Sequence, residues 1–412
     1  MIAERFIYGF PRSLESRRLP AEFDAFAFTI PYEGQLPLAY NMLQALSSAS
    51  SQKFFTIVGG SSPTSNPDIY LEFFDAVYVG ELEPSVHLVV DALLEPSSLL
   101  SSVPGIFVRE KESFQRVYAD NLNTIPHLVK PIISDVSPIT EGYPLEVSRG
   151  CPMSCKFCIG RVIYSPFRWR SLSVLKDIAE RIVESTGVKR LTLIGAGLSY
   201  VPHLPQMLEW LVNKGIGFSL PSVTPSLIFK IHELIQYSGS RTITFAPETP
   251  SETLRRHIGK AIGNEEYFQA AFLLRKRIKN IKLYFMFGLP DERKEDLTQL
   301  QSFVEKFVHF GFQKRNIKIS ATPFVPKKGT PFEDEGMPSL EELERKAGYF
   351  RRLRKEGYVV SIYPLKAARA QAVISLGDRK IGRLLKLLIH KYGVRGWLKL
   401  PETELGGSIL QR

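Results

Sequence analysis

All three cysteines of the chain, Cys151, Cys155 and Cys158, lie within eight residues, in the segment Gly-Cys-Pro-Met-Ser-Cys-Lys-Phe-Cys. Thiolates are the usual ligands of iron–sulfur clusters, and four of them normally saturate a [4Fe–4S] cube. Three thiolates hold three irons and leave the fourth iron open to a ligand from outside the protein. The spacing therefore predicts a [4Fe–4S] cluster that can take part in chemistry.

Three other roles stay open for these thiols. A structural zinc ion takes four ligands, and the nearest histidines in the sequence are His127 and His203, so the fold would have to supply a fourth donor. A disulfide would leave one thiol over, and nothing in the sequence indicates an oxidising compartment. Buried structural thiols are the third alternative. We favour the cluster because the cysteine spacing is specific.

The cysteine segment resembles that of the radical SAM superfamily, which has Cys-x3-Cys-x2-Cys with an aromatic residue before the last cysteine. The resemblance implies that Cys151, Cys155 and Cys158 bind iron and that the open iron binds the amino nitrogen and carboxylate of S-adenosylmethionine (SAM). It implies that one electron then splits SAM into methionine and a 5′-deoxyadenosyl radical, which abstracts a hydrogen atom from a substrate. Phe157 would lie beside the adenine.

Expected strands and helices alternate after the cysteines. Strands are expected at 143–148, 191–195, 217–220, 242–246, 281–287 and 317–321, and helices at 172–185, 204–213, 225–237, 264–278 and 293–310. This alternation predicts a parallel sheet with right-handed crossovers. About six such units make an open barrel rather than a closed eight-fold one. Sites in these architectures gather at the carboxyl ends of the strands, and the cysteine segment directly follows the first strand.

Other expected strand ends carry residues similar to the family's SAM-binding motifs. Gly195, Ala196 and Gly197 stand where the family has Gly-Gly-Glu, and since the acid is missing, main-chain carbonyls would have to hold the methionine amine. An ordinary strand-to-helix turn explains this triplet equally well. Glu248 resembles a residue that meets the ribose or methionine, although a carboxylate in the first turn of a helix is common. The remaining residues that we expect to bind cofactor are Ser219, Ser222, Gly288 and Pro290.

From about residue 24 to about residue 335, the series of motifs resembles radical SAM proteins with a cobalamin-binding-like domain before the barrel. Strands expected at 24–30, 54–60 and 75–81 would form a small Rossmann-like sheet, with Gly60 and Gly80 at strand ends. Such glycines let a cofactor approach, but they also serve ordinary turns. The family's opening strand and Asp-x-His-x-x-Gly loop have no counterpart. A base-off cobalamin stays open, and we favour a structural remnant over a complete corrinoid pocket.

We therefore expect an α/β protein in which a partial (β/α)6 TIM-like barrel follows a small Rossmann-like domain and precedes a basic C-terminal extension. A second cluster, as in tRNA-modifying methylthiotransferases, is excluded because no cysteine remains. The expected parts are a truncated cobalamin-binding-like domain at 1–123, a linker at 124–141, the radical SAM barrel at 142–335 and a basic helical extension at 336–412.

The net charge of +11 lies in one C-terminal tract. Residues 351–400 hold 13 Lys and Arg against 2 Asp and Glu, and the rest of the chain carries equal numbers of each sign. Residues 378–391 are amphipathic at helical spacing, so the simplest interpretation is a docked helix with a solvated basic face. The alternative is an anionic partner, namely RNA, an acidic ferredoxin or an anionic lipid surface.

Three functions follow from these observations. The first is a radical SAM enzyme without bound cobalamin, which takes its electron from a reductant such as ferredoxin or flavodoxin and acts on an unknown substrate. The second is a cobalamin-dependent radical methyltransferase, and the third is a non-catalytic RNA-binding protein with a structural metal. Tyr164, Arg168 and Arg170 could line a substrate pocket or form an ordinary charged loop. No apolar stretch could span a bilayer and no signal peptide opens the chain, so a cytoplasmic location is expected.

Overall fold

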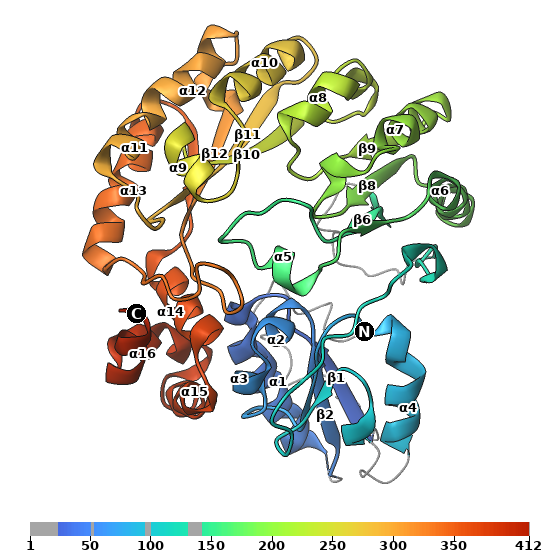
Figure 1. The fold of residues 1–412 in the computed structure, drawn as a ribbon, viewed down its shortest axis with the longest axis vertical. Helices are drawn as coiled ribbons and strands as arrows, with labels where there is room; N and C mark the ends of the chain where they lie inside the picture. Colours follow the sequence, from blue (N-terminus) through green and yellow to red (C-terminus); the bar gives the residue numbers. More distant parts are fainter. Residues whose placement is uncertain (1–23, 51–52, 95–99, 131–141, 412) are drawn as a thin grey trace. The chain divides into compact units, whose positions relative to one another are not determined.

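The structure is a computed structural model that describes residues 24–50, 53–94, 100–130 and 142–411 (Figure 1). Its contacts divide the chain into two compact units. Residues 131–141 of the predicted linker and residues 1–23 of the predicted N-terminal domain lie outside the described residues. The predicted domain boundaries stay a prediction. Unit 1 comprises Met1–Ala119, Val325–Met337 and Arg369–Arg412, and unit 2 comprises Asp120–Phe324 and Pro338–Ala368.

Unit 2 is built on parallel strands in two sheets. The first sheet has the order β5-β8-β9 and the second has the order β10-β11-β12-β13, and every neighbouring pair is parallel. The first six of these strands confirm the six predicted units, whereas β13 was not predicted. The strands are β5 (Tyr143–Glu146), β8 (Arg190–Ile194), β9 (Gly217–Ser219), β10 (Thr242–Glu248), β11 (Asn280–Phe287), β12 (Ile317–Pro323) and β13 (Val359–Ile362).

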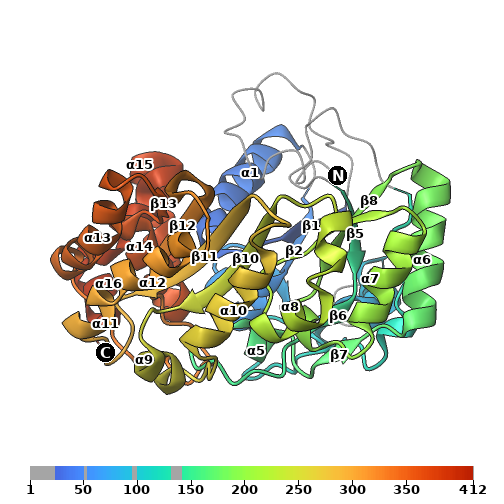
Figure 2. The ribbon, with the colours of Figure 1, turned by 90° about the horizontal axis from the view of Figure 1, so that it is seen from above.

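Helices connect these strands and lie on their outer side (Figures 1 and 2). The predictions at 172–185 and 204–213 are confirmed. The prediction at 225–237 was too long, because α8 ends at Ile231, and the predicted helix at 293–310 consists of α11 (Lys294–Thr298) and α12. The other helices are α6 (Leu172–Thr186), α7 (Leu204–Asn213), α8 (Pro225–Ile231), α10 (Asn264–Leu274), α12 (Leu300–His309) and α13 (Leu340–Lys355).

The long strand β11 shows how unit 2 divides its side chains between two faces. Alternate residues of this strand are buried. The ring of Phe285 lies 5.7 Å from that of Phe303 in α12 and 6.1 Å from that of Phe350 in α13, so these residues pack under the helices. Lys282 and Tyr284 alternate with them and stay partly exposed on the opposite face, which we call the inner face. The inner face is polar, unlike the packed interior of a closed barrel.

Unit 1 contains the smaller sheet, with strand order β1-β2-β3-β4. The first three strands are parallel, and β4 is antiparallel to β3. The predicted N-terminal strands are confirmed, although β3 is shorter than expected. The elements are β1 (Ala25–Thr29), β2 (Phe55–Gly59), β3 (Ala76–Tyr78), β4 (Ile106–Phe107), α1 (Leu36–Ala49) and α4 (Val86–Leu94).

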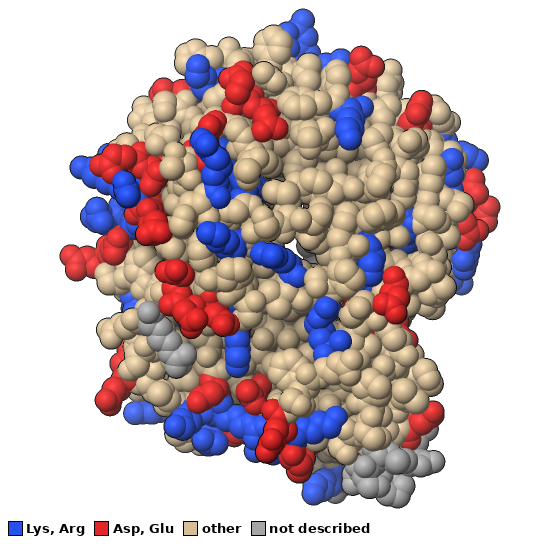
Figure 3. Space-filling view, viewed as in Figure 1, with Lys and Arg blue, Asp and Glu red and all other residues tan. Residues whose placement is uncertain are grey.

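The basic C-terminal tract at 351–400 contains α14 (Leu365–Leu376) and α15 (Arg379–Tyr392), and α16 (Glu404–Ile409) follows it. Helix α15 belongs to unit 1 and packs within it through a buried stripe of Ile381, Leu385 and Ile389. Two of its arginines face acids of unit 1, because Arg379 lies 3.5 Å from Asp68 and Arg383 lies 3.4 Å from Glu72. The predicted docked helix is therefore present. On the face drawn in Figure 3, basic and acidic side chains are interspersed.

Among the helices of the described residues, none combines the length and the apolar content that crossing a membrane requires.

Candidate active site

The three cysteines lie in the loop after β6 (Ser148–Arg149), which follows β5 at its carboxyl end. All three thiols are free, with Cys155 buried and the other two partly exposed. Burial raises the pKa of Cys155 to about 11 and also raises the pKa of Cys151, while the ammonium group of Lys260 acts in the opposite direction. Among the described residues, no group of three or more His, Cys, Asp or Glu side chains is arranged to hold a metal ion as it stands. The three thiol donors of the loop, rather than a preformed metal geometry, therefore mark it as the candidate metal-binding site.

Glycines allow other segments to approach this cysteine loop closely. Gly150 opens the loop with φ 76°, a conformation that side chains disfavour. A Cβ at Gly197 would lie 2.9 Å from the carbonyl oxygen of Gly150 and 3.1 Å from the Cα of Cys151. Gly259, with φ 82°, packs against the carbonyl group of Ser154. The loop is therefore held between the segments that follow β8 and β10.

The Gly195–Gly197 triplet directly follows β8, as the sequence predicts. Gly195 packs against Ser148, and Gly197 is buried against the cysteine loop. Ala196 is exposed. The structure thus brings the triplet to the loop that carries the cysteines.

Strand β10 ends in an irregular segment that carries Glu248. The register with β11 shifts between Phe245 and Glu248, and Glu248 has φ 66°, which is uncommon for a residue other than glycine. Its Oε1 lies 2.7 Å from Nζ of Lys260, and both side chains are nearly buried. Burial would lower the pKa of Lys260, but the carboxylate of Glu248 raises it above its ordinary value. Backbone strain of this kind clusters at functional sites.

Arg255 holds this irregular segment in place. The side chain is fully buried and lies over the ring of Tyr267, 5.2 Å from its centre. A buried guanidinium needs a partner for each donor group. Arg255 donates to the main-chain carbonyls of Pro247, Thr249 and Ile262. It therefore fixes both ends of the loop that presents Glu248, Gly259 and Lys260.

The main chain ties the same segment to the cysteine loop. The N–H of Lys156 donates to the carbonyl of Ile258 over 2.9 Å. The hydroxyl of Ser154 lies 3.4 Å from the carbonyl oxygen of Gly259. Tyr200, which follows β8, lies close enough to the loop for an electrostatic effect. Burial and the nearby Cys151 raise the pKa of Tyr200 to about 12.

The remaining residues that we expected to bind cofactor have other surroundings. Ser219 accepts a hydrogen bond from Nε of Arg190 over 3.0 Å, and Ser222 is exposed. The N–H of Gly288 donates to Glu292 over 2.7 Å. Pro290 is partly exposed in the turn that follows.

Glu292 ends the motif Gly-Leu-Pro-Asp-Glu at 288–292, which also contains Gly288 and Pro290, and its role in this structure is internal. The carboxylate is fully buried and lies 2.8 Å from Nζ of Lys346 in α13. Burial raises the pKa of Glu292, and Lys346 partly offsets this effect. The motif therefore fixes the end of β11 against α13.

Arg168 and Arg170 use their head groups inside the fold. Nη1 of Arg170 donates to the carbonyls of Leu122 and Ile125, and Nη2 of the same residue lies 3.2 Å from Glu146. Arg168 donates to the carbonyls of Tyr164 and Pro166, so it closes its own loop. Tyr164 itself is exposed to 36%. The contacts favour the structural alternative for both arginines.

The two histidines that lie nearest to the cysteines in sequence are engaged elsewhere. Nε2 of His127 accepts from the N–H of Glu146 over 3.1 Å, and burial lowers the pKa of His127. Nε2 of His203 lies 2.9 Å from the carbonyl oxygen of Arg170. The structure does not bring either ring to the thiols as a fourth donor.

Two family models match this chain. Residues 145–304, which include the cysteine loop and β5 to β11, match the model described as "Radical SAM superfamily". Residues 9–118 match the model described as "Radical SAM proteins, N-terminal". The chain belongs to the radical SAM superfamily. It is therefore an enzyme of the class that uses a [4Fe–4S] cluster and SAM.

This radical SAM chain is similar to two curated proteins over most of its length. The uncharacterized protein MJ0966 of Methanocaldococcus jannaschii is 29% identical, over 88% of this chain and 80% of that protein. A bacteriochlorophyllide d C-12(1)-methyltransferase of Chlorobaculum tepidum is 23% identical, over 84% of this chain and 70% of that enzyme.

Two solved radical SAM enzymes share the fold at low sequence identity. The methyltransferase TsrM of Kitasatospora setae aligns with a TM-score of 0.59 and 13% identity, over 78% of this chain and 66% of that chain. The cobalamin-dependent enzyme OxsB aligns with a TM-score of 0.53 and 17% identity, over 92% of this chain. The chain spans 54% of OxsB, so the likeness to it concerns part of that protein.

Sequence reasoning missed the residues that support the cysteine loop from β10. Arg255, Gly259 and Lys260 stand about a hundred residues after the cysteines, and no motif marked them. The sequence Ile-Gly-Lys at 258–260 directly follows a short helix, and a glycine in that place signals a close approach of the chain. Gly259 could therefore have been marked from the sequence, but the sequence does not show that Ser154 is the residue it contacts.

Proposed function

We propose that Cys151, Cys155 and Cys158 bind a [4Fe–4S] cluster and that the enzyme cleaves SAM to abstract a hydrogen atom from its substrate. The single observation that carries this proposal is the loop of three free thiols at the carboxyl end of a parallel strand in a radical SAM domain. The donors fit the group, since thiolates are its usual ligands and both nearby histidines are engaged. When bound, the cluster supplies the electron that splits the sulfonium bond of SAM.

Residues around the cysteine loop would position SAM. Gly195 and Gly197 bring main chain to the cysteine loop, where carbonyl groups can accept from the methionine amine. Lys260 pairs with Glu248 and fixes it at the end of β10, in reach of a ligand in that loop. Phe157, Ser219, Ser222, Gly288 and Pro290 stay predicted contacts of SAM. A reductant such as ferredoxin or flavodoxin would deliver the electron, and the oxygen-sensitive cluster would need a reducing setting such as the cytoplasm.

Methyl transfer is the second candidate reaction. The observation that favours it is the similarity over 84% of the chain to an enzyme named as a methyltransferase, together with the fold shared with TsrM. Cobalamin is bound in a TsrM structure and in OxsB. In unit 1, however, Gly60 and Gly80 approach the chain's own backbone, at Ile30 and Val117. These two glycines of the described strand ends thus pack against the protein's own main chain rather than opening toward a corrinoid.

Anaerobic reconstitution with iron and sulfide tests the proposal. We expect the wild-type protein to bind about four irons and to form 5′-deoxyadenosine from SAM under a low-potential reductant. The triple variant Cys151→Ala, Cys155→Ala, Cys158→Ala should lose both, whereas Met153→Leu in the same loop should keep both. S-adenosylhomocysteine and a corrinoid absorption band would mark methyl transfer. A protein that binds zinc but no iron and never cleaves SAM would overturn the proposal.

A further inference from the structure

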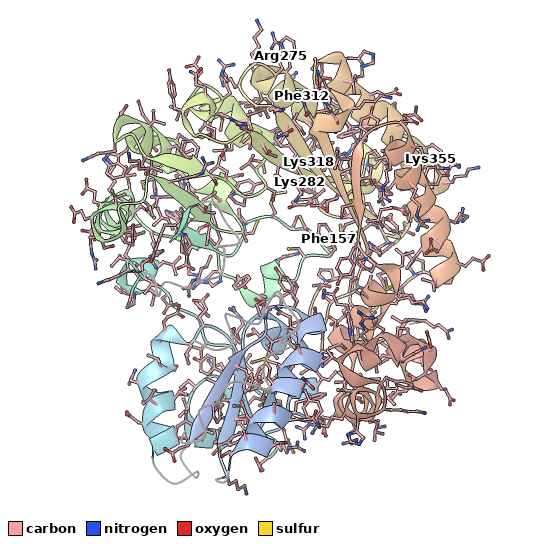
Figure 4. All side chains as sticks on the ribbon, turned by 180° about the vertical axis from the view of Figure 1, so that it is seen from behind. Phe157, Arg275, Lys282, Phe312, Lys318 and Lys355 are labelled. Atoms are coloured by element: carbon pink, nitrogen blue, oxygen red, sulfur yellow. The ribbon has the colours of Figure 1, made fainter. Side chains whose placement is uncertain are left out.

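Neighbouring strands of unit 2 place two lysines side by side on the inner face. Lys282 of β11 and Lys318 of β12 are partners in the parallel register, and Figure 4 shows them on adjacent strands. Adjacent strands are about 4.8 Å apart, so the two side chains start close together. Like charges in directly opposed positions destabilise a sheet. An anion bound beside the pair would offset this repulsion.

The strands of unit 2 do not supply that anion. The seven strands of its two parallel sheets contain two acidic residues, Glu146 and Glu248, and both are engaged by cations at other positions. Nζ of Lys282 lies 4.8 Å from the centre of the Tyr284 ring, a contact with a neutral group. Within the described part of the chain, neither lysine forms an ion pair. Lys318 is exposed and Lys282 is partly exposed, so a ligand can reach them.

Neutral groups that can donate hydrogen bonds lie beside Lys282 and next along the strands, whereas the other register partner of Lys318 is the apolar Val359 of β13. Thr244 of β10 is the register partner of Lys282 on its other side. Tyr284 and Ser320, which are partners of each other, come next on the inner face toward the carboxyl ends of the strands. These three hydroxyl groups are partly exposed. Two ammonium groups beside hydroxyl groups form a surface that suits phosphate or carboxylate oxygens.

We propose that Lys282 and Lys318 bind an anionic group, a phosphate or a carboxylate, of the substrate on which the enzyme acts. This inference rests on the proposed function, because it assigns the inner face to substrate. Thr244 precedes Glu248 by four residues, so the anion site lies on the order of 13 Å from the end of β10. The substrate is therefore an elongated molecule. Its anionic end is held at the lysines and its reacting carbon lies near the cysteine loop.

Isothermal titration of the reconstituted enzyme with inorganic pyrophosphate and with citrate tests the site. We expect the double variant Lys282→Gln, Lys318→Gln to bind the preferred anion at least tenfold more weakly than wild type, as expected when charge-assisted hydrogen bonds are lost. Lys355→Gln, at the exposed end of α13, is the matched control and should bind as wild type does. Preference for pyrophosphate indicates a phosphate ligand, and preference for citrate indicates a carboxylate ligand.

Two further readouts keep the test decisive. The thermal unfolding midpoint of the double variant should equal or exceed that of wild type, since like-charge repulsion is removed. Equal anion binding by wild type and the double variant would overturn the site. Binding is measured without SAM, so the proposed function can fail separately. A wild-type protein that binds pyrophosphate but forms no 5′-deoxyadenosine would sink the proposed function and leave the lysine site in place.

Discussion

Glycines at the ends of parallel strands have different partners in the two units. In unit 2, Gly197 and Gly259 follow β8 and β10 and pack against the loop that carries the cysteines. Each glycine allows close contact with a segment that offers thiol donors. The close approach in unit 2 therefore builds the surroundings of a metal-binding loop.

In unit 1, Gly60 and Gly80 also follow parallel strands and have φ of 106° and 116°. A Cβ at Gly60 would lie 2.9 Å from the main chain of Ile30, and Gly80 packs directly against the main chain of Val117. In unit 1 the glycines therefore pack against main chain that offers no thiol donor. The comparison teaches that a strand-end glycine shows only that another segment approaches closely. The residues of that segment decide whether the contact belongs to a functional site.

The largest expected effect on stability is in unit 2, at the buried ion pair of Lys260 and Glu248. We expect Lys260→Met to lower the free energy of unfolding by about 3–5 kcal/mol, because it leaves Glu248 buried without its cation. Urea unfolding measures this loss. The double variant Lys260→Met, Glu248→Gln removes the uncompensated charge and should recover part of the loss. A single variant within about 1 kcal/mol of wild type would show that the pair does not support the loop.

The close approach in unit 1 can be broken at Gly80. Gly80→Ala adds both a disfavoured backbone conformation and a clash with Val117, so we expect a loss of about 3 kcal/mol in unfolding free energy. Gly311→Ala is the matched control, because Gly311 has φ 103° and open space around it. The control should lose only about 1–2 kcal/mol. Equal losses in urea unfolding would contradict the tight contact at Val117.

Gly259→Ala tests whether the close packing in unit 2 supports iron binding by the cysteine loop. The added methyl group would push against the carbonyl of Ser154 and displace the cysteine loop. We expect a loss of about 2 kcal/mol in unfolding free energy and a fall of more than half in iron bound per chain after reconstitution. Gly311→Ala should bind as much iron as wild type. If the two variants bind equal iron, the packing at Gly259 has no part in the site.

The smallest effect concerns His127, which lies in unit 2 and is engaged by main-chain groups. Burial lowers its pKa in the folded state, so the unfolded chain binds a proton more readily. Stability should therefore fall as the pH drops below about 6.5, by less than about 1.4 kcal/mol per pH unit. His127→Gln keeps an acceptor for Glu146 and should flatten this dependence in urea unfolding between pH 7.5 and 5.5. An unchanged slope would contradict the buried neutral ring.

The sequence predicted those features that depend on nearby residues. The cysteine loop, the six strands of unit 2 and the helix at 204–213 all follow from spacing and periodicity within short segments. The interruption at Gln299 lies beyond what such a pattern can resolve, because periodicity continues across a single irregular residue.

The supports of the site could not be predicted because they join distant segments. The contact between Gly259 and Ser154 exists only once the segment that follows β10 lies against the cysteine loop. The pairing of Lys282 with Lys318 likewise depends on the register of β11 and β12. Strand register is set by tertiary packing, and a single sequence does not state it.

The account depends most on an iron that the protein leaves open for SAM. Electron–nuclear double resonance on the reduced, reconstituted enzyme with SAM labelled with ¹⁵N at the amino group tests this directly. We predict a hyperfine coupling between the labelled nitrogen and the cluster in wild type. A reduced [4Fe–4S] cluster that shows no such coupling while SAM is bound would mean that the fourth iron has a protein ligand, and it would contradict the account.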